Sequence, residues 1–132
     1  MVTSLVIEGV FERFPDLRVV MIEGGFGWLA PLAWRLDKLF ERFRSEVPHL
    51  KMKPSEYIKR NIWATTQPME EPEDRRHLFD TMEWIGWDRL LFASDYPHWD
   101  FDDPVRAFPA GMNRERQTEI LGLNAQAVYK RR

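Results

Sequence analysis

The sequence predicts a single α/β domain, residues 1–132, whose parallel sheet comes from three consecutive βα units. Three short runs of β-branched and other apolar residues alternate with longer segments of helical periodicity, which is typical of parallel sheets with right-handed crossovers. Each apolar run ends at polar or glycine-rich residues, as buried parallel strands do. The length of 132 residues allows one core, and 44% hydrophobic with 30% charged residues indicates a globular chain.

The first part of the chain contains a helix, a strand and a glycine-rich turn. Apolar residues at helical spacing predict an amphipathic helix over residues 1–14. Pro15 ends this helix, and the β-rich run at 17–22 predicts the first strand. The turn at 23–28 is rich in glycine, which allows the backbone to bend tightly and to come close to another group. It has neither of the phosphate-binding patterns GxGxxG and GxxxxGK(S/T), so it predicts no nucleotide site.

The middle of the chain supplies the second strand and the helices beside it. A broad apolar face predicts a long helix over 28–47, which Pro48 ends. A shorter helix is expected at 53–60, because Pro54 suits the first turn of a helix. The run at 61–66 then predicts the second strand.

The last part of the chain holds the third strand between helices. A helix is expected at 74–85, with Gly86 as its left-handed carboxyl-terminal cap. The apolar run at 90–93 predicts the third strand, with charges before it and a polar turn containing Pro97 after it. Helical segments are expected at 102–108, 113–121 and 123–129, and the last has a basic end at Lys130–Arg132 that suits a helix carboxyl end.

The candidate functional residues stand where the predicted strands end. Glu23 follows the first strand, Gln67 the second and Asp95 the third, and His98 comes shortly after Asp95. Because loops from the carboxyl ends of parallel strands converge, we expect Glu23, Gln67 and Asp95 on a common rim. A carboxylate there is a candidate metal ligand or general base. The local residues alone favour a simpler role for Asp95, as a cap of the turn before Pro97, and His98 could either enter the pocket or only order its loop.

Charge and composition exclude several classes of partner. With 19 basic and 21 acidic residues the net charge is -2, which provides no electrostatic basis for binding nucleic acid or an anionic membrane. We expect neither a secretory signal nor a spanning helix, since no apolar run approaches the roughly 20 residues that spanning requires. The absence of cysteine excludes disulfides and thiolate metal sites and fits a cytoplasmic protein.

Three parallel strands make a poor free-standing domain, because parallel sheets are normally covered on both faces and are either closed or broad. We therefore expect the chain to be part of something larger. A complete eight-stranded βα barrel needs about 200 to 250 residues, so this chain would supply only its closing three units. The sheet edges could also pair with a second copy, which would make the protein a homo-oligomer.

Several stretches of the sequence together carry a family resemblance. They are residues 17–25 with Trp28, 34–37, 61–63, 66–68 and 88–98. In this order they resemble the carboxyl-terminal part of the amidohydrolase-2 proteins, a metal-dependent TIM-barrel group that includes aminocarboxymuconate semialdehyde and resorcylate-type decarboxylases. The most specific element is the run Ser94–His98 after a strand. The resemblance covers essentially the whole chain and implies the last three βα units of a (β/α)8 barrel with carboxyl-terminal helices.

The resemblance also implies roles for the candidate residues. Asp95 matches the aspartate after the eighth strand, a ligand or close neighbour of one divalent metal, often zinc, that helps to orient the attacking water or the substrate. Asp95 is therefore the expected catalytic and metal residue, with Glu23, Gln67 and His98 in contact with a small-molecule substrate. Two features depart from the family pattern. The His-x-His pair and the metal histidine after the fifth strand have no counterpart here, and Glu23 stands where the decarboxylases place a histidine.

The expected function is that of the carboxyl-terminal part of a metal-dependent hydrolase or carboxy-lyase. It would act on a small organic acid, ester or amide by hydrolysis or non-oxidative decarboxylation. Catalytic zinc sites use about three protein ligands, so the isolated chain is expected to be inactive. The alternative is a non-catalytic remnant or assembly module that pairs through its sheet edges.

Overall fold

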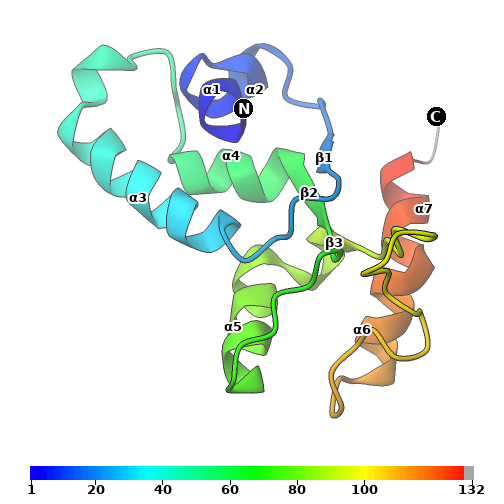
Figure 1. The fold of residues 1–132 in the computed structure, drawn as a ribbon. Coiled ribbons are helices and arrows are strands. Elements are labelled where there is room, and N and C mark those ends of the chain that lie inside the picture. The colour runs from blue at the N-terminus through cyan, green and yellow to red at the C-terminus, as the bar shows by residue number, and fades with distance from the viewer. Residues whose placement is uncertain (130–132) are drawn as a thin grey trace.

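Three short strands lie side by side in one parallel sheet at the centre of the fold (Figure 1). The computed structural model describes residues 1–129. The strands, in the order in which they pair, are β1 (Val19–Met21), β2 (Ile62–Thr65) and β3 (Leu90–Leu91). Val20 is in register with Trp63, and Thr65 with Leu91. This confirms the predicted α/β fold with parallel strands in chain order, although each strand is shorter than the run that predicted it.

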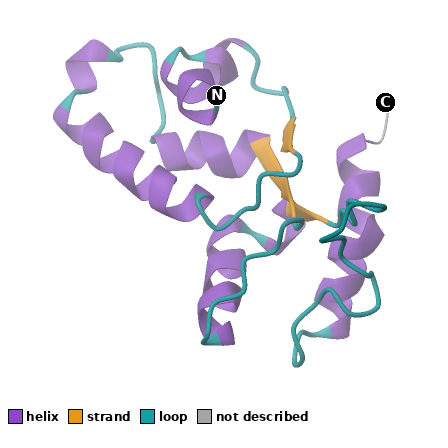
Figure 2. Cartoon of the chain, viewed as in Figure 1, coloured by secondary structure: helices purple, strands orange, loops and turns teal. Residues whose placement is uncertain are grey.

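Helices flank the sheet, with α3, α4 and α5 on one side of it and α6 and α7 on the other (Figures 1 and 2). The helices are α1 (Val2–Ile7), α2 (Val10–Arg13), α3 (Leu29–Arg42), α4 (Pro54–Asn61), α5 (Arg75–Ile85), α6 (Arg114–Thr118) and α7 (Asn124–Tyr129). Short 3₁₀ turns cover Arg44–Glu46 and Trp87–Arg89, and a π-helical segment, Glu119–Leu123, joins α6 to α7. No helix within residues 1–129 is long and apolar enough to cross a bilayer.

The main core lies between one face of the sheet and helices α1 to α5, and Met112 and Ile120 from the carboxyl-terminal part of the chain also belong to it. The strands contribute Ile62, Ala64 and Leu90, none more than 2% exposed. The helices and their loops contribute Val2, Val6, Phe11, Phe26, Leu29, Ala33, Leu36, Leu50, Tyr57, Ile58, Leu78, Met82 and Ile85. Burying one large apolar side chain stabilises a fold by about 1.5 to 3 kcal/mol, so this face dominates the stability of the chain.

The opposite face of the sheet has a much smaller core. It consists of Val20, Trp63 and Leu91 from the strands with Ala125 and Val128 from α7. The guanidinium of Arg18 donates hydrogen bonds to the carbonyls of Ala127 (2.9 Å) and Val128 (2.8 Å) and so caps the end of α7. The amide of Asn124 donates to the carbonyl of Leu90 at 2.9 Å. Two polar side chains therefore hold α7 against the strands.

The predicted helix over 1–14 is broken at Gly9. This residue has a left-handed backbone, with φ of 69°, between α1 and α2. A Cβ at this position would lie 2.6 Å from the ring of His49, whose Nε2 lies 2.7 Å from the carbonyl oxygen of Ile7. The histidine packs against the chain at a point where only glycine leaves room, and periodicity within residues 1–14 does not reveal this contact.

The expected helix at 102–108 was wrong, because this segment forms a single turn within a loop. The backbone amides of Arg106 and Ala107 donate to the carbonyl of Asp103, and the Asp103 carboxylate accepts from the amide of Val105 at 2.8 Å. Pro109 restricts the residue before it to extended conformations, so the turn does not continue as a helix. The hydrogen bonds of Asp103 stabilise a turn here in place of the expected helix.

The carboxyl-terminal helices form nearly as expected. Asn113 caps α6 by accepting a hydrogen bond from the amide of Glu115 at 2.7 Å. The separate segments predicted at 113–121 and 123–129 join through the π-helical segment, and the basic end Lys130–Arg132 lies outside the described residues. Gly86 does follow α5 with a positive φ of 108°, but its ψ of 125° is not that of a left-handed helical cap.

Candidate functional site

The carboxyl ends of the three strands form one rim, as the parallel arrangement requires. Beyond the paired strands, the amide of Thr66 donates to the carbonyl of Leu91 at 2.9 Å. The amide of Glu23 donates to the hydroxyl of Thr65 at 3.1 Å, which fixes the turn after β1 to the end of β2. Glu23 itself has a positive φ of 57°, an uncommon conformation for a residue with a side chain.

The loop after β3 folds back so that two carboxylates flank one imidazole. Nδ1 of His98 lies 2.6 Å from Oδ1 of Asp100 and 3.6 Å from Oδ2 of Asp95. The side chain of Asp95 is 27% exposed and that of His98 is 56% exposed. The amide of Tyr96 donates to the hydroxyl of Ser94, so Ser94, and not Asp95, supplies the side-chain acceptor within this turn. The Asp95 carboxylate is therefore directed toward His98.

Gln67 reaches the same loop from β2, and Glu23 stands after β1 on the same rim. Gln67 is 2% exposed, and its Nε2 lies 3.4 Å from the carbonyl oxygen of Asp100. Within residues 1–129, the buried Oε1 of Gln67 and the buried hydroxyl of Thr66 have no hydrogen-bond partner. The charge of Glu23 acts on His98, as described below. The structure thus brings Gln67, His98 and Asp95 to the segment 95–100, and it fixes Glu23 to the end of β2 on the same rim.

The charges around His98 favour its protonated form. The hydrogen bond to Asp100 is the largest cause that raises the pKa of His98. Desolvation, the second largest cause, opposes it, and the charges of Asp100, Asp95 and Glu23 each contribute less in the raising direction. The same hydrogen bond lowers the pKa of Asp100. Burial raises the pKa of Asp102, whose Oδ2 is buried without a partner within residues 1–129. The rim is therefore acidic, with one imidazole among several carboxyl groups.

Glu70 is a residue of this region that the sequence did not single out. It follows β2, and its Oε1 accepts hydrogen bonds from the amides of Phe26 (3.1 Å) and Gly27 (2.8 Å) in the turn after β1. A Cβ on Gly25 would lie 2.6 Å from the same oxygen. The glycine-rich turn did indicate a close approach to another group, and that group is the Glu70 carboxylate.

Asp95, His98 and Asp100 can each offer one ligand atom, and these atoms lie within 4.8 Å of one another. Carboxylate oxygens and imidazole nitrogens suit zinc and manganese, and about three protein ligands are usual at a catalytic metal. The donor types of this loop therefore suit a divalent metal, but His98 and Asp100 are bonded to each other, so the loop supplies only part of a ligand set. Sequence reasoning had placed Asp95 at such a site, but it had not identified Asp100.

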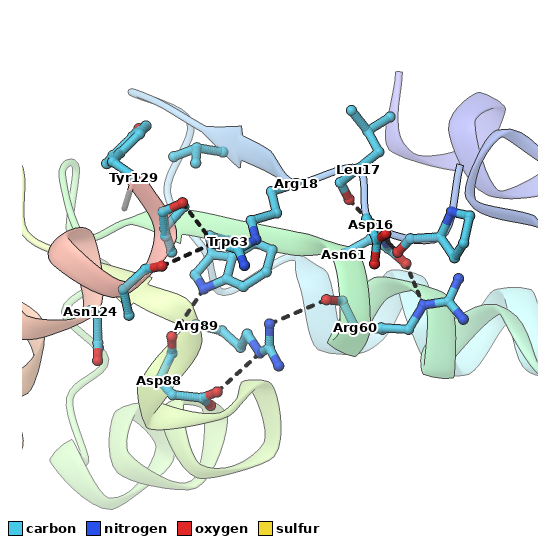
Figure 3. Close-up of a pocket in the computed structure, with 14 residues that line it drawn as sticks. Asp16, Leu17, Arg18, Arg60, Asn61, Trp63, Asp88, Arg89, Asn124 and Tyr129 are labelled. Atoms are coloured by element: carbon cyan, nitrogen blue, oxygen red, sulfur yellow. Dashed lines mark hydrogen bonds and ion pairs between the residues drawn. The ribbon is translucent and has the colours of Figure 1, made fainter. Parts of the chain in front are cut away.

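A hollow of about 970 Å³ lies at the other end of the sheet from this rim (Figure 3). It is lined by residues that precede the strands, among them Arg18, Asn61 and Arg89, and by the end of α7. The Arg89 guanidinium lies 4.4 Å from the ring centroid of Trp63, and Arg18 is bound to α7 as described above. In βα barrels the amino ends of the strands usually serve stability, so we do not place the chemistry here.

Comparison with known proteins identifies the family of the chain. Residues 1–131 match the family model described as amidohydrolase. The chain belongs to the amidohydrolase family. Among curated proteins it is 27% identical over 124 residues to a gamma-resorcylate decarboxylase from Polaromonas sp. strain JS666, a match that covers 92% of this chain. This amidohydrolase-family chain spans only 37% of the length of that relative.

Solved structures place the amidohydrolase-family chain within a barrel. An amidohydrolase from Mycobacterium avium subsp. paratuberculosis K-10 is 28% identical with a TM-score of 0.79, and the match covers 96% of this chain and 32% of that one. A 5-carboxyvanillate decarboxylase from Novosphingobium aromaticivorans, complexed with manganese and 4-hydroxy-3-methoxy-5-nitrobenzoic acid, is 26% identical with a TM-score of 0.76 over 96% of this chain and 37% of that one. The fold is therefore that of part of a TIM-barrel amidohydrolase, as the resemblance implied.

Proposed function

We propose that this chain is the carboxyl-terminal part of a metal-dependent enzyme that cleaves a small organic acid, ester or amide. The observation that carries the proposal is the group formed by Asp95, His98 and Asp100 at the carboxyl ends of the strands, where βα barrels carry their chemistry. Two of the three proteins named above are decarboxylases of aromatic acids, which favours an aromatic acid as the substrate.

Asp95 is proposed as the metal ligand and catalytic carboxylate of this site. His98 and Asp100 offer further donors beside it, and the metal is a divalent ion, either zinc as first expected or the manganese that the decarboxylase from Novosphingobium binds. A bound divalent metal supplies Lewis acidity and lowers the pKa of a bound water to about 7. The Asp95 carboxylate is placed to hold or release the proton of a substrate group at this position.

The other rim residues are proposed to hold the substrate. Gln67 is proposed to support the substrate side of the rim from below through its contact with the carbonyl of Asp100, and the partly exposed His98 can donate to a substrate carboxylate. Glu23 is an acid where the decarboxylases place a histidine. A carboxylate at this position disfavours a decarboxylation that depends on that histidine. The proposal therefore includes hydrolysis and a decarboxylation by another route.

The proposal includes the inactivity of the isolated chain. The chain spans 37% of the curated relative, and the His-x-His pair has no counterpart in it. We expect titration of the chain with Mn²⁺ or Zn²⁺ in a calorimeter to show no tight stoichiometric binding. Tight binding of one ion per chain would contradict the view that most ligands lie in another part of the barrel.

A chimera tests the role of Asp95 directly. The matched segment of the Polaromonas gamma-resorcylate decarboxylase is replaced by residues 1–131 of this chain, and metal content and release of CO₂ from gamma-resorcylate are measured. Asp95→Asn should lower turnover at least about 100-fold with loss of metal, because even outer-shell partners of a metal contribute 10- to 100-fold. Asp88→Asn is the matched control, since Asp88 lies at the other end of the sheet. Full metal content in the Asp95→Asn chimera would refute the assignment.

A second candidate function is the assembly module without catalysis. The observation that favours it is the sheet itself, in which β1 and β3 each pair only with β2 among the described strands. Sedimentation of the metal-free chain distinguishes a self-paired module from a barrel part. A stable dimer favours the module, and a monomer favours the part of an enzyme.

A further inference from the structure

The turn after β1 holds Glu23 in a backbone conformation that needs support. Glu23 and Asp95 are the two non-glycine residues within 1–129 that have a positive φ, at 57° and 55°. Each of them stands after a strand of the sheet, Glu23 after β1 and Asp95 after β3. A side chain makes this conformation unfavourable, so it persists where neighbouring groups fix it, which is common at functional sites. The groups that fix Glu23 therefore bear on the candidate site.

Two hydrogen bonds fix the beginning of this turn. The hydroxyl of Thr65, at the end of β2, accepts from the amide of Glu23 at 3.1 Å. The indole of Trp28 donates to the carbonyl of Gly24 at 2.8 Å and so closes the turn on itself. The first bond holds only the amide side of Glu23, and the second lies within the turn.

The remaining support comes from Glu70, in the loop between β2 and α5. Its Oε1 accepts from the amide of Phe26 at 3.1 Å and from that of Gly27 at 2.8 Å. A Cβ on Gly25 would lie 2.6 Å from this oxygen, and a Cβ on Gly27 would lie 3.0 Å from it. The glycines of the turn thus leave the space that the Glu70 carboxylate occupies.

The φ of Glu23 depends on both sides of the residue. Thr65 fixes its amide side to β2, and Glu70 fixes the following segment, residues 24–27, to the loop after the same strand. Glu23 itself is exposed, so its carboxylate is open to a ligand. Removal of Glu70 would leave the amide of Glu23 in place but free the chain after it.

We propose that Glu70 is a positioning residue, which fixes the place of the Glu23 carboxylate on the rim by holding the turn after β1 against the loop after β2. The inference rests on the proposed function, in which Glu23 contacts the substrate. An ionised carboxylate can only accept hydrogen bonds. A fixed Glu23 therefore favours a substrate that presents a hydroxyl or amide donor to it, and it disfavours a substrate with an acid group at that place.

Hydrogen exchange of indole groups, measured by NMR on the chain without metal or substrate, tests the positioning itself. The indole of Trp28 reports on the turn, because its acceptor Gly24 is next to Glu23. The indole of Trp63, which donates to a backbone carbonyl at the other end of the sheet, is the control. In Glu70→Ala, exchange at Trp28 should increase about tenfold more than exchange at Trp63, because the opening is local. Equal increases would overturn the proposal, since Glu70 would then stabilise the whole fold and not this turn.

Binding to the metal-loaded chimera described above tests the consequence for the site. The probe is gamma-resorcylate, and its affinity is measured by calorimetry. Glu23→Ala and Glu70→Ala should each weaken binding about tenfold, the effect of one lost hydrogen bond to a charged group. The double variant should bind no more weakly than Glu23→Ala, because Glu70 acts through Glu23. Two losses that multiply would overturn the proposal.

Two further substitutions complete the test. Glu70→Gln keeps a carbonyl oxygen for the two amides and should restore most of the affinity, and the exposed neighbour Glu71 should tolerate alanine. Unchanged affinity in Glu23→Ala or Glu70→Ala, or equal weakening by Glu70→Gln and Glu70→Ala, would overturn the proposal. A failure of the proposed function differs from these results. It would appear as full metal content in the Asp95→Asn chimera, while exchange at Trp28 still depends on Glu70.

Discussion

Replacement of Glu70 by alanine should destabilise the turn that carries Glu23. In the native structure one oxygen of Glu70 accepts hydrogen bonds from the amides of Phe26 and Gly27. Phe26 is fully buried, so its amide has no access to water when the carboxylate is removed. The turn is also held in place by the bond from the amide of Glu23 to Thr65, which the substitution leaves intact.

The size of the effect follows from these contacts. Hydrogen bonds to a charged group contribute about 1.5 to 3 kcal/mol each, which gives about 3 to 6 kcal/mol for two of them. The other carboxylate oxygen of Glu70 is buried without a partner within residues 1–129, and its removal returns about 1 to 3 kcal/mol. The net cost of Glu70→Ala in the free energy of unfolding should therefore lie between about 0 and 5 kcal/mol, with a central value of about 2.5 kcal/mol.

Urea unfolding followed by tryptophan fluorescence measures this cost, since Trp28 donates to the carbonyl of Gly24 within the same turn. The exposed neighbour Glu71 is the control, and Glu71→Ala should change the free energy by less than about 0.5 kcal/mol. A coupling test adds Gly25→Ala, whose new Cβ would meet the Glu70 oxygen at 2.6 Å. Gly25→Ala should lower the free energy of unfolding by less in the Glu70→Ala variant than in the unmodified chain. Equal effects of Glu70→Ala and Glu71→Ala, or strict additivity with Gly25→Ala, would refute the reasoning.

Two further predictions concern the body of the fold. Gly9→Ala should cost more than about 1 kcal/mol in the free energy of urea unfolding, because a Cβ there meets His49 at a positive φ. Gly122→Ala is the control and should be neutral or stabilising, because a Cβ there meets nothing within 4 Å. Similar costs of the two substitutions would argue against the contact with His49. The hydrogen bond from Tyr57 lowers the pKa of Glu12 from 4.5. The stabilisation of the fold by this hydrogen bond should therefore be present above pH 4.5 and lost as the pH falls through the lower pKa of Glu12 in the folded protein. Burial, followed by the bond to Glu12, raises the pKa of Tyr57 from 10.0, so stability should hold below pH 10 and fall as the pH rises through the native value. In pH-dependent unfolding, Tyr57→Phe should flatten the acid limb, and an unchanged acid limb would contradict the pairing.

Much of the architecture could be predicted from the sequence because it depends on local patterns. The apolar runs at 17–22, 61–66 and 90–93 each contain a strand, and Pro54 begins a helix as its fixed φ favours. The break at Gly9 could not be predicted in this way. It depends on His49, which is distant in the chain, and no periodicity within the first helix reports that contact.

The candidate site could likewise be predicted only in part from the sequence. The positions of Glu23, Gln67 and Asp95 after their strands were sufficient to predict a common rim, because parallel strands in chain order present their carboxyl ends together. The side chains that these residues contact could not be predicted from their positions in the sequence. That His98 lies between Asp95 and Asp100 depends on the path of an irregular loop, for which composition allows several conformations.

The sequence by itself determined which residues stand at strand ends, because short apolar runs between segments of helical periodicity specify the strands, the helices and their order. Only the tertiary structure decided which of these side chains meet. Glu70 enters the turn after β1 from more than forty positions further along the chain, and His98 is held by one carboxylate while it faces another. Such contacts depend on the distances and directions of groups brought together by folding, and a linear pattern of residue types contains neither.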